Sequence, residues 1–241
     1  FFYSGGIKNN YLFFLKNKLL RLLFPYILFS TIAFFPKAIL SKFALRPIEI
    51  SFESYIKGII YPWDNPIIFF WFLPTLFIIF LLSPILTYSL NTKFKMLFIT
   101  FILTLLTLIN PFEEIKILNI SGIAHYLFYF WLGILACKYS EKILSFLKSP
   151  ITFFISLATL ITISILISIN DIDINLVLFS TSIIGIIMSF SFANQYLKIG
   201  FKFLNKLNGY SSQIYFLSWF FQTFFQVLLF KLLHLNYFLV I

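Results

Sequence analysis

Charged side chains are scarce in this sequence, and acidic ones are the scarcest. Only 11% of the 241 residues are charged, whereas 61% are hydrophobic and 22% are aromatic. A typical soluble domain has about 25% charged residues. A soluble fold of this size could not bury so much apolar surface, because much of its surface must face water. The composition therefore excludes an ordinary soluble domain and places the chain in a lipid bilayer.

Cysteine and histidine are almost absent as well. Cys137 is the single cysteine, so no internal disulfide can form, and its apolar neighbours are typical of a small core residue. His125 and His234 lie far apart in the sequence, and together with one cysteine they do not provide a usual metal site. We therefore expect no bound metal and no bound cofactor.

Long apolar runs fill most of the chain. A helix needs about 20 mostly apolar residues to cross the hydrocarbon core of a bilayer. The runs predict an all-α, polytopic transmembrane helix bundle with about seven complete spans, at 19–36, 67–90, 96–110, 122–138, 151–169, 176–195 and 212–233. The apolar ends, 1–6 and 236–241, resemble parts of two further spans. We therefore expect a single transmembrane domain over 1–241 that is truncated at both ends.

The basic residues give an orientation. The chain has 18 Lys and Arg and 8 Asp and Glu, a net charge of +10. Alternate loops divide the basic residues into two groups. The larger group is Lys8, Lys16, Lys18, Arg21, Lys93, Lys95, Lys138, Lys142, Lys148, Lys198, Lys202 and Lys206, and the smaller is Lys37, Lys42, Arg46, Lys57, Lys116 and Lys231. Cytoplasmic loops are enriched in Lys and Arg, so the larger group is predicted to be cytoplasmic. We interpret this charge as topogenic and expect no nucleic-acid partner.

The longest loop on the outer side, 37–65, carries charges of both signs together with Pro47, Pro62 and Trp63. Within it, residues 52–61 have the pattern of an amphipathic helix that lies on the outer leaflet. Long loops of this kind often carry function. The alternative is an ordinary connector between two spans.

Two candidate sites follow from charged and titratable residues. Lys18 and Arg21 lie three residues apart at the cytoplasmic edge of the first predicted span, and this spacing puts both on one face of a helix. Such a pair can clamp phosphates, or it can simply anchor the span at the membrane surface. His125, near the outer end of the fourth span, is a candidate general base or a polar interface residue.

Other polar and aromatic residues permit two readings. Trp71, like Trp63, fits the aromatic belt of a membrane interface. Ser211 and Tyr215 open the last predicted span from the inside, and polar residues deeper in that span can bond neighbouring helices or line a polar path. No Asp or Glu falls in the middle of a predicted span, which argues against an ion-coupled pump.

Five short motifs occur in order along the chain. They are Phe-Phe-Tyr-Ser-Gly-Gly at 1–6, a basic pair followed by Pro-Tyr at 18–26, Trp-Phe-Leu-Pro at 71–74, Tyr-Phe-Trp-Leu-Gly at 129–133, and Gly-Tyr-Ser-Ser-Gln-Ile-Tyr-Phe-Leu at 209–217. In the same order, they resemble the FFxxSG, RxxR with Pro-Tyr, WFL, YFxxG and SYxIYLxH segments of the integral-membrane acyltransferase 3 family. The resemblance covers most of the chain.

The resemblance implies a ten-span bundle with a cytoplasmic N-terminus. It also implies transfer of an acyl group, usually acetyl, from cytosolic acyl-CoA to a hydroxyl of a surface glycan. The family's presumed catalytic His lies in the first span, which this chain lacks, so the fragment alone is expected to be inactive. Ser218 stands where the family has a later His, and Lys18 replaces the first Arg of the basic pair, which removes its bidentate geometry.

The sequence therefore predicts a membrane-embedded O-acyltransferase of the cell envelope, multi-pass in the bacterial inner membrane. Its expected partners are the lipid bilayer, acyl-CoA and a glycan or lipid-linked sugar acceptor. Lys18 and Arg21 would hold the donor's phosphates, Trp71, Ser211 and Tyr215 would line the acceptor channel, and His125 is a weak candidate for catalysis. The alternatives are a polysaccharide transporter or flippase subunit, and a structural polytopic subunit without chemistry.

Overall fold

A computed structural model describes residues 11–39, 51–169, 174–199, 209–226 and 228, and within these ranges the chain is helical and contains no strand. The longer helices are α1 (Tyr11–Lys18), α2 (Phe24–Ile39), α3 (Phe52–Ile60), α4 (Phe72–Ser89), α5 (Lys93–Ile109), α6 (Ile120–Lys138), α7 (Ser140–Leu147), α8 (Pro150–Ile169), α9 (Ile174–Ile199) and α11 (Ser211–Gln226). Shorter segments are the π-helical turn η1 (Leu19–Leu23) and the 3-10 turns η3 (Pro62–Asp64), η4 (Ile68–Trp71) and η5 (Ile117–Asn119). The all-α prediction is confirmed.

Among the described residues, five helical segments are long and apolar enough to cross a membrane. They are Tyr11–Lys37, Ile68–Ser89, Ile117–Lys138, Pro150–Ser168 and Leu176–Tyr196. The predicted count of seven is not confirmed. Helix α5 has 17 residues, a length of about 26 Å that falls short of the hydrocarbon core of about 30 Å. The described part of α11 has 16 residues, and most of its predicted continuation lies outside the described residues.

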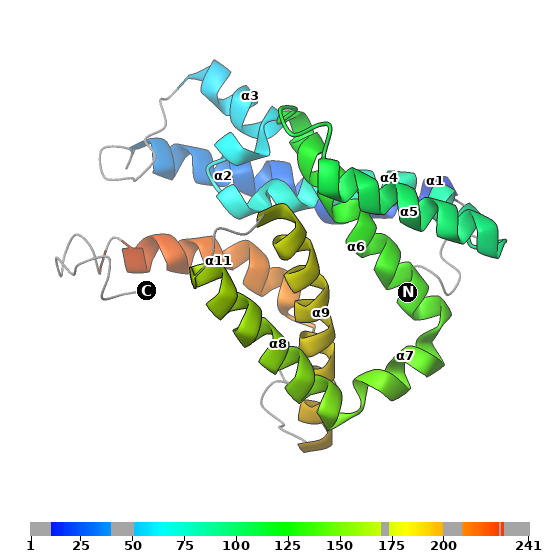
Figure 1. Cartoon of the computed structure of the whole chain (residues 1–241). Helices are drawn as coiled ribbons and strands as arrows, with labels where there is room; N and C mark the ends of the chain where they lie inside the picture. Colours follow the sequence, from blue (N-terminus) through cyan, green and yellow to red (C-terminus); the bar gives the residue numbers. More distant parts are fainter. Residues whose placement is uncertain (1–10, 40–50, 170–173, 200–208, 227, 229–241) are drawn as a thin grey trace.

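The helices pack in two groups (Figure 1). In the continuous helix of α1, η1 and α2, the parts α1 and η1 lie along α4 and α2 packs against α3, while α4 and α5 both pack against α6. Their core surrounds Trp131, which is fully buried and donates its indole N–H to Thr100 Oγ1 at 2.8 Å. Helices α8 and α9 form a hairpin that extends away from this group, and the short helix α7 connects it to α6. The sequence predicted a loop at α7, so that helix was missed.

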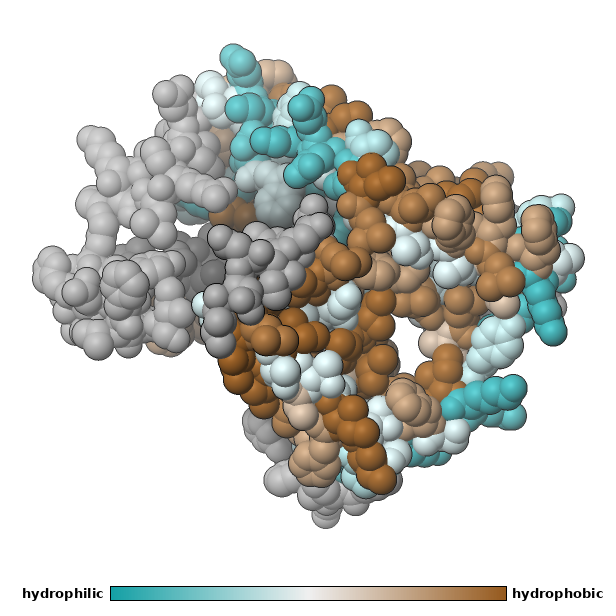
Figure 2. Space-filling view, viewed as in Figure 1, coloured by the Kyte–Doolittle hydropathy of each residue, from teal (hydrophilic) through white to brown (hydrophobic). Residues whose placement is uncertain are grey.

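Large apolar side chains remain exposed along the long helices. On α5 they include Phe94, Phe98 and Phe101. Figure 2 shows broad hydrophobic surfaces along the bundle, whereas hydrophilic residues gather mainly at its ends. Lipid solvates an apolar surface of this kind, as the composition requires.

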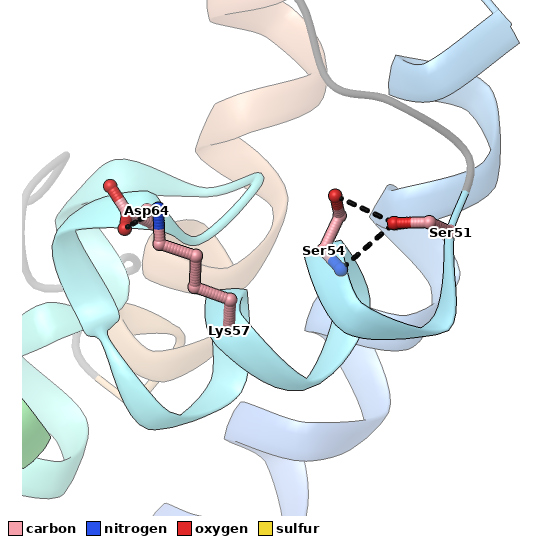
Figure 3. Close-up of polar contacts among 4 residues, drawn as sticks. All are labelled: Ser51, Ser54, Lys57 and Asp64. Atoms are coloured by element: carbon pink, nitrogen blue, oxygen red, sulfur yellow. Dashed lines mark hydrogen bonds and ion pairs between the residues drawn. The ribbon is translucent and has the colours of Figure 1, made fainter.

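The predicted amphipathic segment 52–61 is confirmed as a helix, α3 (Figure 3). Ser51 caps it, because its Oγ accepts the Ser54 backbone N–H at 3.0 Å. Lys57 reaches from α3 to Asp64 at 3.4 Å. The contact of α3 with the outer leaflet stays a prediction.

Asn65 joins the loop after α3 to α2. Its Nδ2 donates to Ser30 Oγ at 2.8 Å and to the Gly58 carbonyl at 3.0 Å, while its Oδ1 accepts the Ile67 N–H at 2.8 Å. The Tyr26 hydroxyl adds a bond to the Ile59 carbonyl at 2.8 Å. Because Asn65 is buried, these bonds fix α3 and the start of α4 against the first span.

We expect Asn65→Leu to lower the free energy of unfolding by about 1–3 kcal/mol, because it leaves the buried Ile67 N–H and Ser30 hydroxyl without their partner. Chemical unfolding in mixed micelles measures this. Asn91→Leu is the matched control, because Asn91 is exposed in the turn between α4 and α5. Equal losses in the two variants would contradict the role of Asn65.

Candidate functional site

Lys18 and Arg21 lie at the π-helical turn η1. The Phe24 N–H bonds to the Leu19 carbonyl, five residues back, so the turn is wider than an α-helical one. Lys18 Nζ lies 4.1 Å from the centre of the Phe80 ring, whereas Arg21 is exposed. That Lys18 and Arg21 share one face of the helix stays a prediction. Single π-helical turns are frequent at functional sites.

Lys18 lies further inside its helical segment than the sequence predicted. The described helix already includes Tyr11, ahead of the predicted start at 19, and the Tyr11 hydroxyl donates to the Leu81 carbonyl at 2.7 Å. Phe80, the ring beside Lys18, precedes the end of α4 at Ser89 by nine residues, or about 14 Å of helix. Lys18 is therefore not at the edge of its span. It lies beside the middle of α4, in a segment long and apolar enough to cross a membrane, and an ionisable group within such a segment is a functional candidate.

At the other end of α4, three aromatic rings form a continuous stack. Trp63 and Trp71 are stacked with ring centres 5.4 Å apart, and Trp71 and Tyr126 with centres 5.1 Å apart. We call Trp63, Trp71 and Tyr126 the aromatic stack. It joins the η3 turn, the end of the η4 turn and the second turn of α6.

A buried hydrogen-bond chain holds the aromatic stack in place. The Trp63 indole N–H donates to Asn119 Oδ1 at 3.0 Å, and Asn119 Nδ2 donates to Thr75 Oγ1 at 2.8 Å. Thr75 Oγ1 in turn donates to the Trp71 carbonyl at 2.7 Å. Asn119 is only 2% exposed. Its side chain therefore links Trp63 to α4 inside the protein.

The backbone before α6 is bent to place Asn119. Leu118 has φ +47° and Asn119 has φ +57°. These left-handed values are uncommon outside glycine, and for a leucine they store strain of about 1–3 kcal/mol. Gly122 then leaves the space that the amide occupies, because a Cβ at this position would collide with the Asn119 side chain.

A pocket of about 300 Å³ opens beside Trp63. Its lining is polar and carries charges of both signs, and consists of Trp63, Asp64, Glu113, Lys116, Asn119 and Ser121. We call it the Trp63 pocket. It lies among the loops that the charge count assigns to the outer side.

His125 and Tyr215, the other predicted site residues with described side chains, lie near the same end of the bundle. The His125 ring is half-buried between Tyr126 and Tyr129, with ring centres 5.0 and 5.7 Å away. The Tyr215 hydroxyl donates to the Phe69 carbonyl at 2.7 Å. Tyr215 therefore lies against η4, just before α4. The predicted place of Tyr215 at the inner end of its span stays a prediction. Their functional roles stay predictions.

Ser211 begins α11, but its side chain lies outside the described residues. The structure brings Trp71 and Tyr126 together. Lys18 lies apart from them, because its neighbour Phe80 comes nine residues after Trp71, or about 14 Å of helix.

Sequence reasoning missed Asn119, Thr75 and Gly122. The one signal was an asparagine just before an apolar run, where it reads as a helix cap. Its side chain bonds Trp63 instead.

The described residues contain no group of three His, Cys, Asp or Glu side chains that could hold a metal.

Comparison with known proteins gave one family. Its model, described as an acyltransferase domain, matches residues 1–241. No curated protein and no solved structure matches the chain. The motifs, the apolar helices and a match along the whole sequence agree, and the chain belongs to the acyltransferase 3 family.

Proposed function

We propose that the protein transfers an acyl group, in the simplest case acetyl, from cytosolic acyl-CoA to a hydroxyl of a cell-surface glycan or lipid-linked sugar. It would do so in the bacterial inner membrane. One observation carries the proposal. Within a chain of an acyltransferase family, α4 has a cation from the first span beside its middle and an aromatic stack with a polar pocket at its outer end.

The donor would bind from the side of Lys18 and Arg21. Two cations in a span are costly in lipid unless an anion or water accompanies them, and the phosphates of acyl-CoA would supply that anion. Arg21 can bond two phosphate oxygens through its planar fork, while Lys18 acts as a point charge. The thioester, at the end of a long flexible arm, would then extend along α4 towards Trp71.

The transfer needs a base at the acceptor hydroxyl. The hydroxyl oxygen attacks the thioester carbonyl, the carbon–sulfur bond breaks, and the thiol of CoA leaves with the proton that the base removed. Attack is direct or passes through an acyl relay. The family resemblance assigns the base to a His in an earlier span. His125 is the weaker candidate, and Trp71, Tyr215 and Ser211 would line the acceptor path.

The test separates transfer from transport. We expect deletion of the full-length gene to leave glycan export intact and to remove only its acyl groups, with loss of label transfer from radioactive acetyl-CoA in isolated membranes. Mass spectrometry of the surface glycan measures both the amount of exported glycan and its acyl groups. A polysaccharide transporter or flippase subunit predicts the opposite result, in which glycan export stops. That outcome would contradict the proposed transfer.

A further inference from the structure

We propose that the Trp63 pocket binds one uncharged sugar ring, stacked on the exposed part of the Trp63 indole. The identification of this sugar as the acceptor rests on the proposed function. The binding itself rests on three features of the pocket: a fixed exposed indole, a polar lining with charges of both signs, and a small volume.

The indole of Trp63 is exposed and yet held in place. It is 42% exposed, it stacks on Trp71, and its N–H is bonded to the buried Asn119. A tryptophan that only anchors a helix at the headgroups needs no such buried support. The face of an indole carries negative charge density, which attracts the C–H groups along one face of a pyranose ring. A ring fixed before binding loses little conformational entropy when the sugar stacks on it.

The lining suits hydroxyl groups better than an anion. Glu113 and Asp64 offer carboxylate oxygens as acceptors, while Lys116 and Ser121 offer donors. Asp64 is also paired with Lys57 at 3.4 Å, which offsets part of the negative charge. The two carboxylates are balanced by Lys116 in the lining and by Lys57, so the pocket offers a phosphate or carboxylate on the sugar no net positive charge to bind.

The size of the pocket sets the size of the ligand. A volume of about 300 Å³ lies at the lower limit of small-molecule sites, which range from about 300 to 1,000 Å³. The space between its walls therefore suits a single ring. The rest of a glycan would extend outward from the loops that form the pocket.

Saturation-transfer NMR on the full-length protein in phosphatidylcholine nanodiscs tests this binding. The probes are methyl glucoside, methyl galactoside, the methyl glycoside of N-acetylglucosamine, and methyl glucuronide as the anionic counterpart. We expect at least one neutral glycoside to receive saturation, strongest on the C–H protons of one ring face, and methyl glucuronide to receive none. Trp63→Ala should weaken binding by about tenfold or more, and Trp63→Phe by less.

Phe52→Ala is the matched control, because Phe52 is an exposed aromatic residue on α3, outside the lining of the pocket. It should keep the affinity of the unmodified protein. The inference is overturned if no neutral glycoside gains saturation over empty nanodiscs, or if Trp63→Ala binds as well as the unmodified protein. Acyl-transfer assays separate the two proposals: sugar binding without transfer contradicts only the function, and transfer with an unchanged acceptor KM in Trp63→Ala contradicts only the inference.

Discussion

Replacing Lys18 and Arg21 together by alanine is expected to reduce acyl transfer by about a hundredfold or more. Each cation would make a charge-assisted contact with a donor phosphate, worth about 1.5–3 kcal/mol. Loss of both contacts then removes about 3 kcal/mol or more of transition-state binding, and each 1.36 kcal/mol is a factor of ten in rate. Labelled acetyl-CoA, added to membranes that carry the full-length protein, measures the change.

A second pair of lysines provides the control. Lys93 and Lys95 begin α5 on the side that the charge count assigns to the cytoplasm, so Lys93→Ala with Lys95→Ala removes the same charge. If Lys18 and Arg21 only anchored their span, the two double variants would lose activity alike. Unchanged acylation in the variant without Lys18 and Arg21 would also refute the clamp. Lys18→Arg is expected to retain transfer, because it restores the pair of arginines that the family resemblance implies.

Gly122→Ala is expected to lower the free energy of unfolding by about 2–4 kcal/mol. Alanine is normally more favourable than glycine inside a helix, by about 1 kcal/mol. Helix propensity alone would therefore predict a more stable variant, the opposite of the loss expected here. The added methyl group collides with the Asn119 side chain. Displacing that amide breaks its bonds to Trp63 and Thr75, and each buried polar group left unpaired costs about 1–3 kcal/mol.

Helix α6 contains its own control. Gly133 lies in the same helix, and a Cβ there meets nothing within 4 Å, so Gly133→Ala should be neutral or stabilise the protein by up to about 1 kcal/mol. Equilibrium unfolding of both variants in mixed micelles provides the comparison. Similar values for the two substitutions would mean that Asn119 moves aside at little cost.

The fold class could be predicted because it depends on composition and on the length of apolar runs. Helix α3 could also be predicted, since its amphipathic pattern is local and Ser51 caps it. The place of Lys18 beside the middle of α4 could not be predicted, because its neighbour Phe80 is remote in the sequence. The number of spans could not be fixed either, because an apolar run such as α5 does not specify where its helix ends.

The aromatic stack shows the same limit at the candidate site. Trp63 and Trp71 both fit an aromatic belt at the membrane interface, and that interpretation alone explained why tryptophans occur at these positions. The bond that fixes Trp63 comes from Asn119, 56 residues later. It depends on left-handed backbone at Leu118, a residue that gives no sequence signal for that conformation. Interactions between distant segments of this kind are what pattern reasoning cannot predict.

The position of Lys18 beside the middle of α4 also bears on how the chain enters the membrane during synthesis. Its segment, Tyr11–Lys37, carries Lys16, Lys18 and Arg21 in its first half, and each cation opposes insertion by up to about 2.5–3.5 kcal/mol, the cost at the centre of a helix. The ring that covers Lys18 belongs to α4, which the ribosome makes later. We therefore expect the segment Tyr11–Lys37 to insert shallowly at first. It would reach its final position only after α4 has entered the bilayer and packed against it.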